Sequence, residues 1–310
     1  MSEDKKQGAI PGKSLFIMGR FNKLLLYCSL IFLIVYLYQI EHLSPVTIYS
    51  NWSLIGAFAL LFLGFTFQCL CWHGSLTLHS IPATKKQAVV SIGLSVFAKY
   101  IPGKIWLILG RASCISEITG HRVQQVTIIS LYAQLISIWT GLLIGLPIVI
   151  DYHTMLFWPY LIACLVLSLI VLENKIRSRL LSTIELFIKS TTILSFFKTK
   201  TSYPLILMFL ATWGCWSIGF LLLLIACIDS QIAWSNALFF PLAATLGIVA
   251  FITPGGLGVR EGILFALMLH YGFDAKFSTT FVILSRIWFV IGELFIFSVG
   301  AFFHFQNKKG

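Results

Sequence analysis

The chain has 310 residues, of which 58% are hydrophobic and only 11% are charged, and its mean hydropathy is +0.91. An ordinary soluble domain needs more charge than this to cover its surface, so the composition excludes that class. The net charge of +11 is spread over short segments between apolar runs, which excludes a basic nucleic-acid-binding domain. We therefore expect an all-α polytopic membrane protein.

Apolar runs of membrane-spanning length recur along the chain. A helix needs roughly 20 apolar residues to cross a hydrocarbon core. Six runs approach or exceed this length: 24–40, 54–72, 123–150, 154–172, 204–228 and 280–304. Two further apolar regions, 88–110 and 236–271, are each interrupted by a Pro-Gly pair. A single kinked span is the alternative for these regions, but 236–271 is too long for one crossing.

The positions of Lys and Arg indicate how the interrupted regions cross. Seventeen of these cations lie in five segments: the head 1–23, the loops 73–87, 111–122 and 173–203, and the tail 305–310. The positive-inside rule places these segments, and both termini, on the cytoplasmic side of the inner membrane. Region 88–110 then enters and leaves from the cytoplasm, and 236–271 enters and leaves from outside. Each is predicted to be a re-entrant helical hairpin.

The predicted segments form two units of the same design. Residues 24–150 contain span, span, hairpin and span, and residues 154–304 repeat this order from the opposite side of the membrane. Inverted repeats of this kind are typical of secondary transporters, whose substrate site lies at the midplane where broken helices of the two halves meet. The sequence thus predicts eight membrane segments, of which six are full spans and two are opposed hairpins.

Charged side chains remain inside the predicted membrane region. They are four cations and two acids: Lys99, Lys104, Arg260, Arg286, Glu261 and Glu293. Charge within a bilayer normally lines a cavity or is paired. Pairing of Arg286 with Glu293, about two helical turns apart, would account for only part of the charge. The excess of about two positive charges predicts a bound anion, and the two acids are candidates for proton coupling.

Backbone groups at the two breaks favour the same kind of ligand. The helix that starts after each Pro-Gly pair would point free N–H groups and its positive dipole end into the cavity. Four glycines would let the main chain approach a ligand closely: Gly103, Gly255, Gly256 and Gly258. A tight re-entrant turn is the alternative explanation of these glycines.

Strings at the two breaks resemble a known family. KYIPGKIWLILGR at 99–111, TPGGLGVREGIL at 253–264 and the following Leu284-Ser-Arg286 are similar to the integral-membrane flippase-like family that includes the transmembrane region of lysylphosphatidylglycerol synthase. The resemblance covers most of the chain and implies movement of a lipid between leaflets. It assigns substrate binding to Lys99, Pro102, Gly103, Arg111, Pro254, Gly255, Gly256, Gly258, Arg260, Glu261 and Arg286, and the charge argument adds Lys104. The soluble aminoacyl transferase domain of a full synthase is missing, so synthesis of lysyl lipid is not implied.

The expected function is transport of an anionic phospholipid, modified phospholipid or polyprenyl-phosphate-linked headgroup through a midplane cationic site. No metal, cofactor or enzyme is expected, because the sequence contains no zinc-helix or serine-hydrolase motif, and Cys69, Cys71 and His73 lack metal-site spacing. The alternative is a non-catalytic subunit that scaffolds lipid- or glycan-synthesis enzymes through segment 173–203. Apolar residues at helical spacing in that segment fit either an interfacial helix or a topology signal alone. An unrecognised lipid-modifying enzyme is a third hypothesis.

Overall fold

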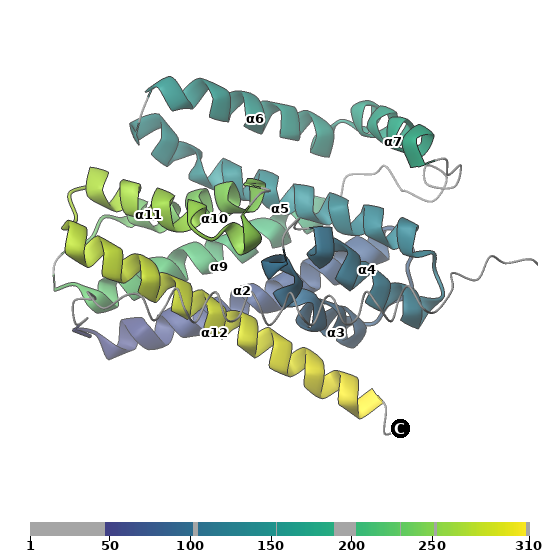
Figure 1. The fold of residues 1–310 in the computed structure, drawn as a ribbon, viewed down its shortest axis with the longest axis horizontal. Coiled ribbons are helices and arrows are strands. Elements are labelled where there is room, and N and C mark those ends of the chain that lie inside the picture. The colour runs from purple at the N-terminus through teal and green to yellow at the C-terminus, as the bar shows by residue number, and fades with distance from the viewer. Residues whose placement is uncertain are drawn as a thin grey trace, which may run out of the picture. The chain divides into compact units, whose positions relative to one another are not determined.

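The computed structural model describes residues 47–101, 105–152, 154–188, 203–229, 231–250 and 253–307. All of these belong to one compact unit, His42–Gly310. Within the described ranges the chain forms ten α-helices and three short 3-10 helices, with no strand (Figure 1). The predicted span 24–40, the N-terminal head 1–23 and residues 189–202 of the predicted loop 173–203 lie outside the described residues.

Five of the predicted spans fall within the described part, and each is a helix. They are α2 (Asn51–Leu78), α5 (Val123–Tyr152), α6 (Thr154–Leu172), α9 (Tyr203–Cys227) and α12 (Ala275–Asn307). Four of them, α2, α5, α9 and α12, are long and apolar enough to cross a membrane. Helix α6 makes a fifth only if it is counted together with α7 (Asn174–Ile188). The described residues therefore show a helical protein with four to five candidate spans, and not the eight-segment arrangement.

Helices α6 and α7 meet at a sharp corner. The bend between them is 90°, and both lie at the edge of the helix assembly next to α5 (Figure 1). Arg177, predicted to be a cytoplasmic loop cation, is only 2% exposed there. Its guanidinium donates to the carbonyl of Val171 at the end of α6 and to the Tyr132 hydroxyl, the latter at 2.7 Å. A cation at a helix C-terminus satisfies the last carbonyl groups, so Arg177 fixes the corner.

Two predicted cytoplasmic loops are largely helical. Helix α2 continues through the predicted loop to Leu78, and α3 (Lys85–Ser95) begins after Thr84, which exchanges capping hydrogen bonds with Gln87. Helix α4 (Ile105–Thr119) takes up most of 111–122 and stops before Gly120, whose φ is +72°. The assignment of Arg111 to a cytoplasmic loop is therefore wrong.

The helices on either side of each Pro-Gly break pack on each other. After α3 the chain forms a 3-10 helix, η1 (Val96–Tyr100), and α4 then packs back on α3. A Cβ atom on Gly110 of α4 would lie 3.1 Å from the Cβ of Ser95. These contacts give the first break the form of a helical hairpin.

The second break has the same local form. Helices α10 (Phe239–Val249) and α11 (Val259–His270) pack on each other on either side of a short 3-10 turn, η3 (Pro254–Gly256). Gly247 of α10 lies against Arg260 of α11, where a Cβ atom on Gly247 would be 3.1 Å from the Arg260 Cβ. The turns η1 and η3 contact each other, so the tips of the two hairpins meet.

Helices α2 and α9 pack along their whole length in opposite directions. Gly56 faces Leu222, Gly64 faces Trp216, and Gly74 faces Leu205. Around this pair, the helices of the two hairpins make matching contacts. The first helix of each hairpin packs on the long helix that follows the other hairpin: α3 on α12, and α10 on α5. The second helix of each hairpin packs on the long helix that follows it: α4 on α5, and α11 on α12. These contacts of the first half thus have counterparts in the second half.

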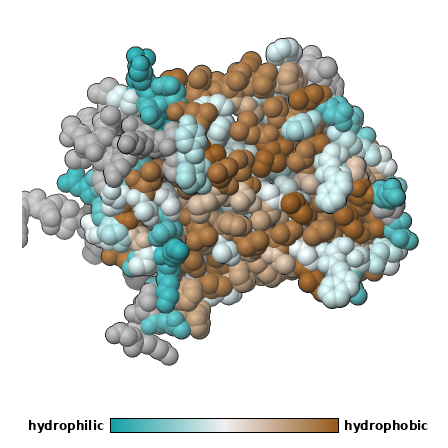
Figure 2. Space-filling view, turned by 180° about the vertical axis from the view of Figure 1, so that it is seen from behind, coloured by the Kyte–Doolittle hydropathy of each residue, from teal (hydrophilic) through white to brown (hydrophobic). Residues whose placement is uncertain are grey.

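Apolar side chains cover much of the outer surface. Trp158, Ile162 and Leu165 of α6 are 64%, 58% and 56% exposed. In Figure 2, hydrophobic residues fill a broad region of the visible face, and hydrophilic residues gather towards its sides. A surface of this kind is stable against lipid and not against water.

Candidate functional site

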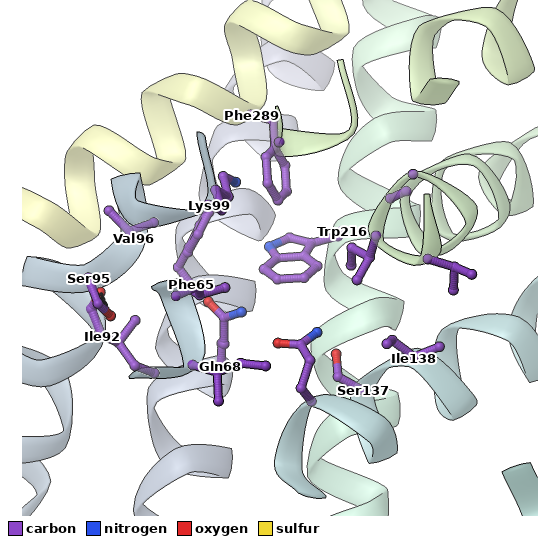
Figure 3. A pocket seen from close by; sticks show the side chains of 18 of the residues that line it. Phe65, Gln68, Ile92, Ser95, Val96, Lys99, Ser137, Ile138, Trp216 and Phe289 are labelled. Atoms are coloured by element: carbon purple, nitrogen blue, oxygen red, sulfur yellow. Dashed lines mark hydrogen bonds between the residues drawn. The ribbon is translucent and has the colours of Figure 1, made fainter. Parts of the chain in front are cut away.

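A cavity of about 380 Å³ lies among the two hairpins and helices α2, α5, α9 and α12. This volume is within the range of small-molecule sites. Four cationic side chains contribute to its wall: Lys99, Arg111, Arg260 and Arg286. Figure 3 shows Lys99, Phe289 and Trp216 close together, with the amide of Gln68 below them, and the rings of Trp216 and Phe289 are in contact with centroids 5.2 Å apart. Because the cations come from both hairpins and from α12, the site exists only when the two halves are assembled.

Lys99 at the end of η1 is held by α12. Its ammonium group forms an ion pair with Glu293, whose side chain is fully buried, and lies 5.2 Å from the ring centroid of Phe289. The hydroxyl of Tyr100 donates to the other carboxylate oxygen of Glu293 at 2.8 Å. Glu293 therefore faces Lys99 and Tyr100, and its carboxylate is engaged by the protein itself.

Arg286 joins α12 to the second hairpin. Its Nη1 lies 3.3 Å from Oε1 of Glu261, and its Nη2 donates to the Tyr100 hydroxyl at 3.1 Å. The predicted pair of Arg286 with Glu293 is not formed, because seven residues separate the two along α12 by about 10 Å. Each finds its partner on a neighbouring element instead, and Tyr100 contacts both.

The N-terminus of α11 is occupied by the chain's own carboxylate. Oε2 of Glu261 accepts a hydrogen bond from the backbone N–H of Gly258 at 2.8 Å. An acid in the first turn also interacts favourably with the helix dipole. The N-terminus of α11 is therefore less able to bind an anionic ligand than the sequence predicted. The case for an anion depends on the arginines.

Arg111 and Arg260 occupy equivalent places in the two halves. Arg111 of α4 donates to the backbone carbonyl of Ser130 in α5, and Arg260 of α11 donates to the backbone carbonyl of Ser285 in α12 at 3.3 Å. Each guanidinium also lies 4.9 Å from an aromatic ring centroid, that of Trp72 for Arg111 and that of Phe240 for Arg260.

Neither of these arginines has an acidic partner among the described residues. The ion pairs of the site join Lys99 to Glu293 and Arg286 to Glu261, and no described carboxylate lies within 4.0 Å of Arg111 or Arg260. Arg111 is 6% exposed and Arg260 is 4% exposed, and Nε of Arg260 has no hydrogen-bond partner in the described part of the chain. An unpaired buried charge costs several kcal/mol, on the order of 3–5 when a partner is removed. Of the four cations on the cavity wall, two are therefore paired with described carboxylates, and Arg111 and Arg260 are left as a positive surplus.

The residues predicted for the site divide into three groups. Those that line the cavity are Lys99, Arg111, Gly255, Arg260 and Arg286. Gly256, Gly258 and Glu261 lie in the second hairpin outside the cavity wall, and Pro254 begins the turn η3. Pro102, Gly103 and Lys104 lie outside the described residues.

Two of the predicted glycines serve the packing of the second hairpin tip. Gly255 and Gly256 have φ angles of +59° and +72°. A Cβ atom on Gly255 would lie 2.7 Å from the ring of Tyr100, and one on Gly256 would lie 2.9 Å from the carbonyl oxygen of Gly247. Glycine is needed here for the turn and for close packing against protein, as the tight-turn alternative proposed, while Gly255 also reaches the cavity.

Three functional candidates were not found from the sequence: Tyr100, Gln68 and Gln134. Tyr100 connects the two ion pairs, and both glutamines line the cavity. The available signal was an uncharged polar side chain inside an apolar run, which is enriched at helix contacts in membranes. Periodicity could not show which helix each of them would face.

Comparisons with protein-family models, with curated proteins and with solved structures found no match to this chain. The resemblance of the two interrupted strings to the flippase-like family therefore stays a prediction. What can be concluded about the site comes from its geometry: an internal cavity whose wall carries two buried, unpaired guanidinium groups.

Proposed function

We propose that this protein is an integral membrane transporter that moves a lipid with an anionic headgroup between leaflets. The observation that carries the proposal is the pair Arg111 and Arg260, each buried, each without an acidic partner in the described part of the chain, and both on the wall of one cavity. Guanidinium groups bind phosphate with paired N–H donors, so a lipid phosphate would supply the missing charge.

We further propose the full arrangement of six spans and two opposed re-entrant hairpins in the cytoplasmic membrane, with both termini in the cytoplasm. The antiparallel packing of α2 on α9, the matched contacts of the two halves and the meeting of η1 with η3 support it. Loop charge supplies the orientation. In this arrangement the cavity lies at the hairpin tips, where transporters built from inverted repeats place their substrate.

The remaining charges suggest how binding is linked to movement. Lys99 and Arg286 line the cavity, while their partners Glu293 and Glu261 lie behind them. An incoming phosphate competes with both carboxylates for the cations, which would loosen the contact between η1 and η3 that Tyr100 bridges. In this scheme the lipid tails stay in the bilayer, and Glu261 or Glu293 takes up a proton when its cation turns to the substrate.

The proposal is tested in proteoliposomes with a headgroup-labelled phosphatidylglycerol and a leaflet-specific quencher. Arg111→Gln and Arg260→Gln should each lower the transfer rate about tenfold or more, because each removes a charge-assisted contact of ~1.5–3 kcal/mol to the phosphate. Arg179→Gln is the matched control, since Arg179 is exposed on α7 away from the cavity. Transfer that is unchanged in both cavity variants would contradict the site.

The same variants separate the alternatives. A scaffolding subunit acting through segment 173–203 predicts that Arg179→Gln impairs function in cells while Arg260→Gln does not. Among the described residues, one observation supports the scaffolding hypothesis: helix α7 is amphipathic and is bent by 90° from α6. An enzyme predicts chemical conversion of the labelled lipid in detergent, where no leaflets exist.

A further inference from the structure

Among the described residues, the wall of the cavity carries positive charge and uncharged polar groups, and no carboxylate. Its charged residues are Lys99, Arg111, Arg260 and Arg286, while Glu261 and Glu293 are absent from the wall and engaged by the chain's own cations. We propose, resting on the proposed function, that the cavity selects a phosphate-bearing headgroup whose other groups are uncharged hydroxyls or amides. It should discriminate against headgroups with a free amine, aminoacylated lipids included.

The phosphate end of the site is set by the arginines. Arg111 and Arg260 approach the cavity from opposite hairpins, and Nε of Arg260 and Nε of Arg286 are buried without a hydrogen-bond partner among the described residues. These are donors in a fixed planar group and can be satisfied only by an acceptor. A phosphate offers several acceptor oxygens and the charge that two unpaired guanidinium groups require.

Two amides supply the uncharged polar part. Gln68 of α2 and Gln134 of α5 line the cavity and are only partly buried, and within the described chain no hydrogen bond engages either side chain. Figure 3 shows the Gln68 amide directed into the space. Each amide offers two donors and a carbonyl acceptor, a combination that suits hydroxyl or amide groups on a ligand.

Two tryptophans close the wall between these ends. The indole N–H of Trp213 donates to the carbonyl of Ser137 at 2.8 Å, and that of Trp216 donates to the carbonyl of Leu61 at 3.3 Å. Their polar atoms are therefore satisfied by the backbone, and only apolar ring surface remains for the ligand. An uncharged ring or a glycerol chain can pack on that surface without loss of hydration at a charged group.

A free amine on the headgroup would find no acidic partner among the described residues that line this cavity. It would be desolvated beside a wall with four cations, two of which, Arg111 and Arg260, form no ion pair with a described carboxylate. Like charges brought together in a poorly solvated site cost several kcal/mol. A lysyl headgroup, with its added positive charge, is therefore disfavoured.

The test is a binding measurement on the purified chain in nanodiscs, read by fluorescence of the tryptophans. The probes are four dioctanoyl or short-prenyl lipids: phosphatidylglycerol, a prenyl-phosphate-linked hexose, phosphatidylethanolamine and lysylphosphatidylglycerol. The first two should shift the emission at concentrations about tenfold or more below the last two. Whichever of the two anionic lipids binds more tightly identifies the source of the phosphate, glycerolipid or lipid-linked sugar.

A charge variant makes the test independent of folding. Gln134→Glu places a carboxylate on the cavity wall. It should therefore weaken the binding of phosphatidylglycerol and strengthen the binding of the lysyl lipid, so that the ratio of the two affinities falls by about tenfold. Gln231→Glu on the outer surface is the matched control and should leave the ratio unchanged, since Gln231 is exposed outside this cavity. Equal or tighter binding of the lysyl lipid by the unaltered protein, or no saturable shift with either anionic lipid, would overturn the inference. If selectivity is found without transfer between leaflets, the proposed function fails while the headgroup selectivity stands.

Discussion

At the scale of single residues, Tyr100 is the junction of the buried charge network. Its hydroxyl donates to Glu293 at 2.8 Å and accepts from Arg286 at 3.1 Å, and its ring faces Gly255 of the other hairpin. Through these contacts, one side chain on η1 links both ion pairs of the site. No charge count could have found it, since it carries no formal charge.

Removing this hydroxyl should destabilise the protein measurably. In Tyr100→Phe a buried carboxylate oxygen and a buried guanidinium each lose a partner, which we expect to cost ~1–3 kcal/mol in the free energy of unfolding. The measurement is reversible unfolding in mixed micelles. Tyr203→Phe is the control, because Tyr203 is 72% exposed at the start of α9. Equal effects of the two substitutions would show that the network contributes no stability.

At the scale of elements, glycines set how closely the helices approach. Gly93 of α3 and Gly300 of α12 face each other, and a Cβ atom on Gly93 would lie 2.5 Å from the carbonyl oxygen of Ile296. Such close backbone contact between small residues is a common basis of helix association in membranes, where apolar side chains gain little by leaving lipid. The same contact positions η1, and with it Lys99, against Glu293 of α12.

Widening this contact should impair both folding and the site. In Gly93→Ala the added methyl group meets backbone that cannot rotate away, so we expect a loss of ~1–3 kcal/mol in stability and a lower transfer rate. Gly262→Ala is the matched control, because Gly262 is an exposed helical glycine at which an added Cβ atom would meet nothing within 4 Å. It should be neutral or stabilising by ~0.4–1 kcal/mol. The comparison uses the same micelle unfolding and proteoliposome assays, and a Gly93→Ala protein as stable as the control would refute the packing argument.

At the scale of the whole molecule, the described unit is built from two halves that make matching contacts, and the equivalent helices α2 and α9 run in opposite directions. Arg111 with Ser130 and Arg260 with Ser285 show this at the site, and α2 against α9 shows it at the centre. This relation makes a sharp prediction about membrane sidedness. If both interrupted regions are re-entrant, the two ends of each hairpin lie on one side.

Cysteine labelling from either side of intact cells tests that topology. Lys85→Cys and Arg122→Cys flank the first hairpin and should react only from the cytoplasm, whereas Ser235→Cys and Lys276→Cys flank the second and should react only from outside. All four positions are exposed in the structure. The unaltered protein serves as the background, since it contains cysteines of its own. Ends of one hairpin that label from opposite sides would show that it crosses the membrane.

The sequence alone determined the class of protein and the positions of its helices. Runs of apolar residues and Pro-Gly breaks depend on local composition, so 54–72, 123–150 and 204–228 correspond to α2, α5 and α9, and the helices that flank each break pack on each other. It also singled out Lys99, Arg260 and Arg286 as cations within apolar regions, where they are rare, and all three line the cavity.

Only the tertiary structure decided which charges are paired and which are free. Ion pairs form between side chains a few ångströms apart, and that proximity is set by packing between helices that are distant in the chain. Arg286 therefore pairs with Glu261 and not with Glu293. Arg111, which the loop assignment placed in 111–122, lies in α4 on the cavity wall. The sequence shows that cations outnumber acids in the apolar regions. Only the fold shows that the cations without an ion pair are Arg111 and Arg260, because those two guanidinium groups are buried with no described carboxylate within 4.0 Å.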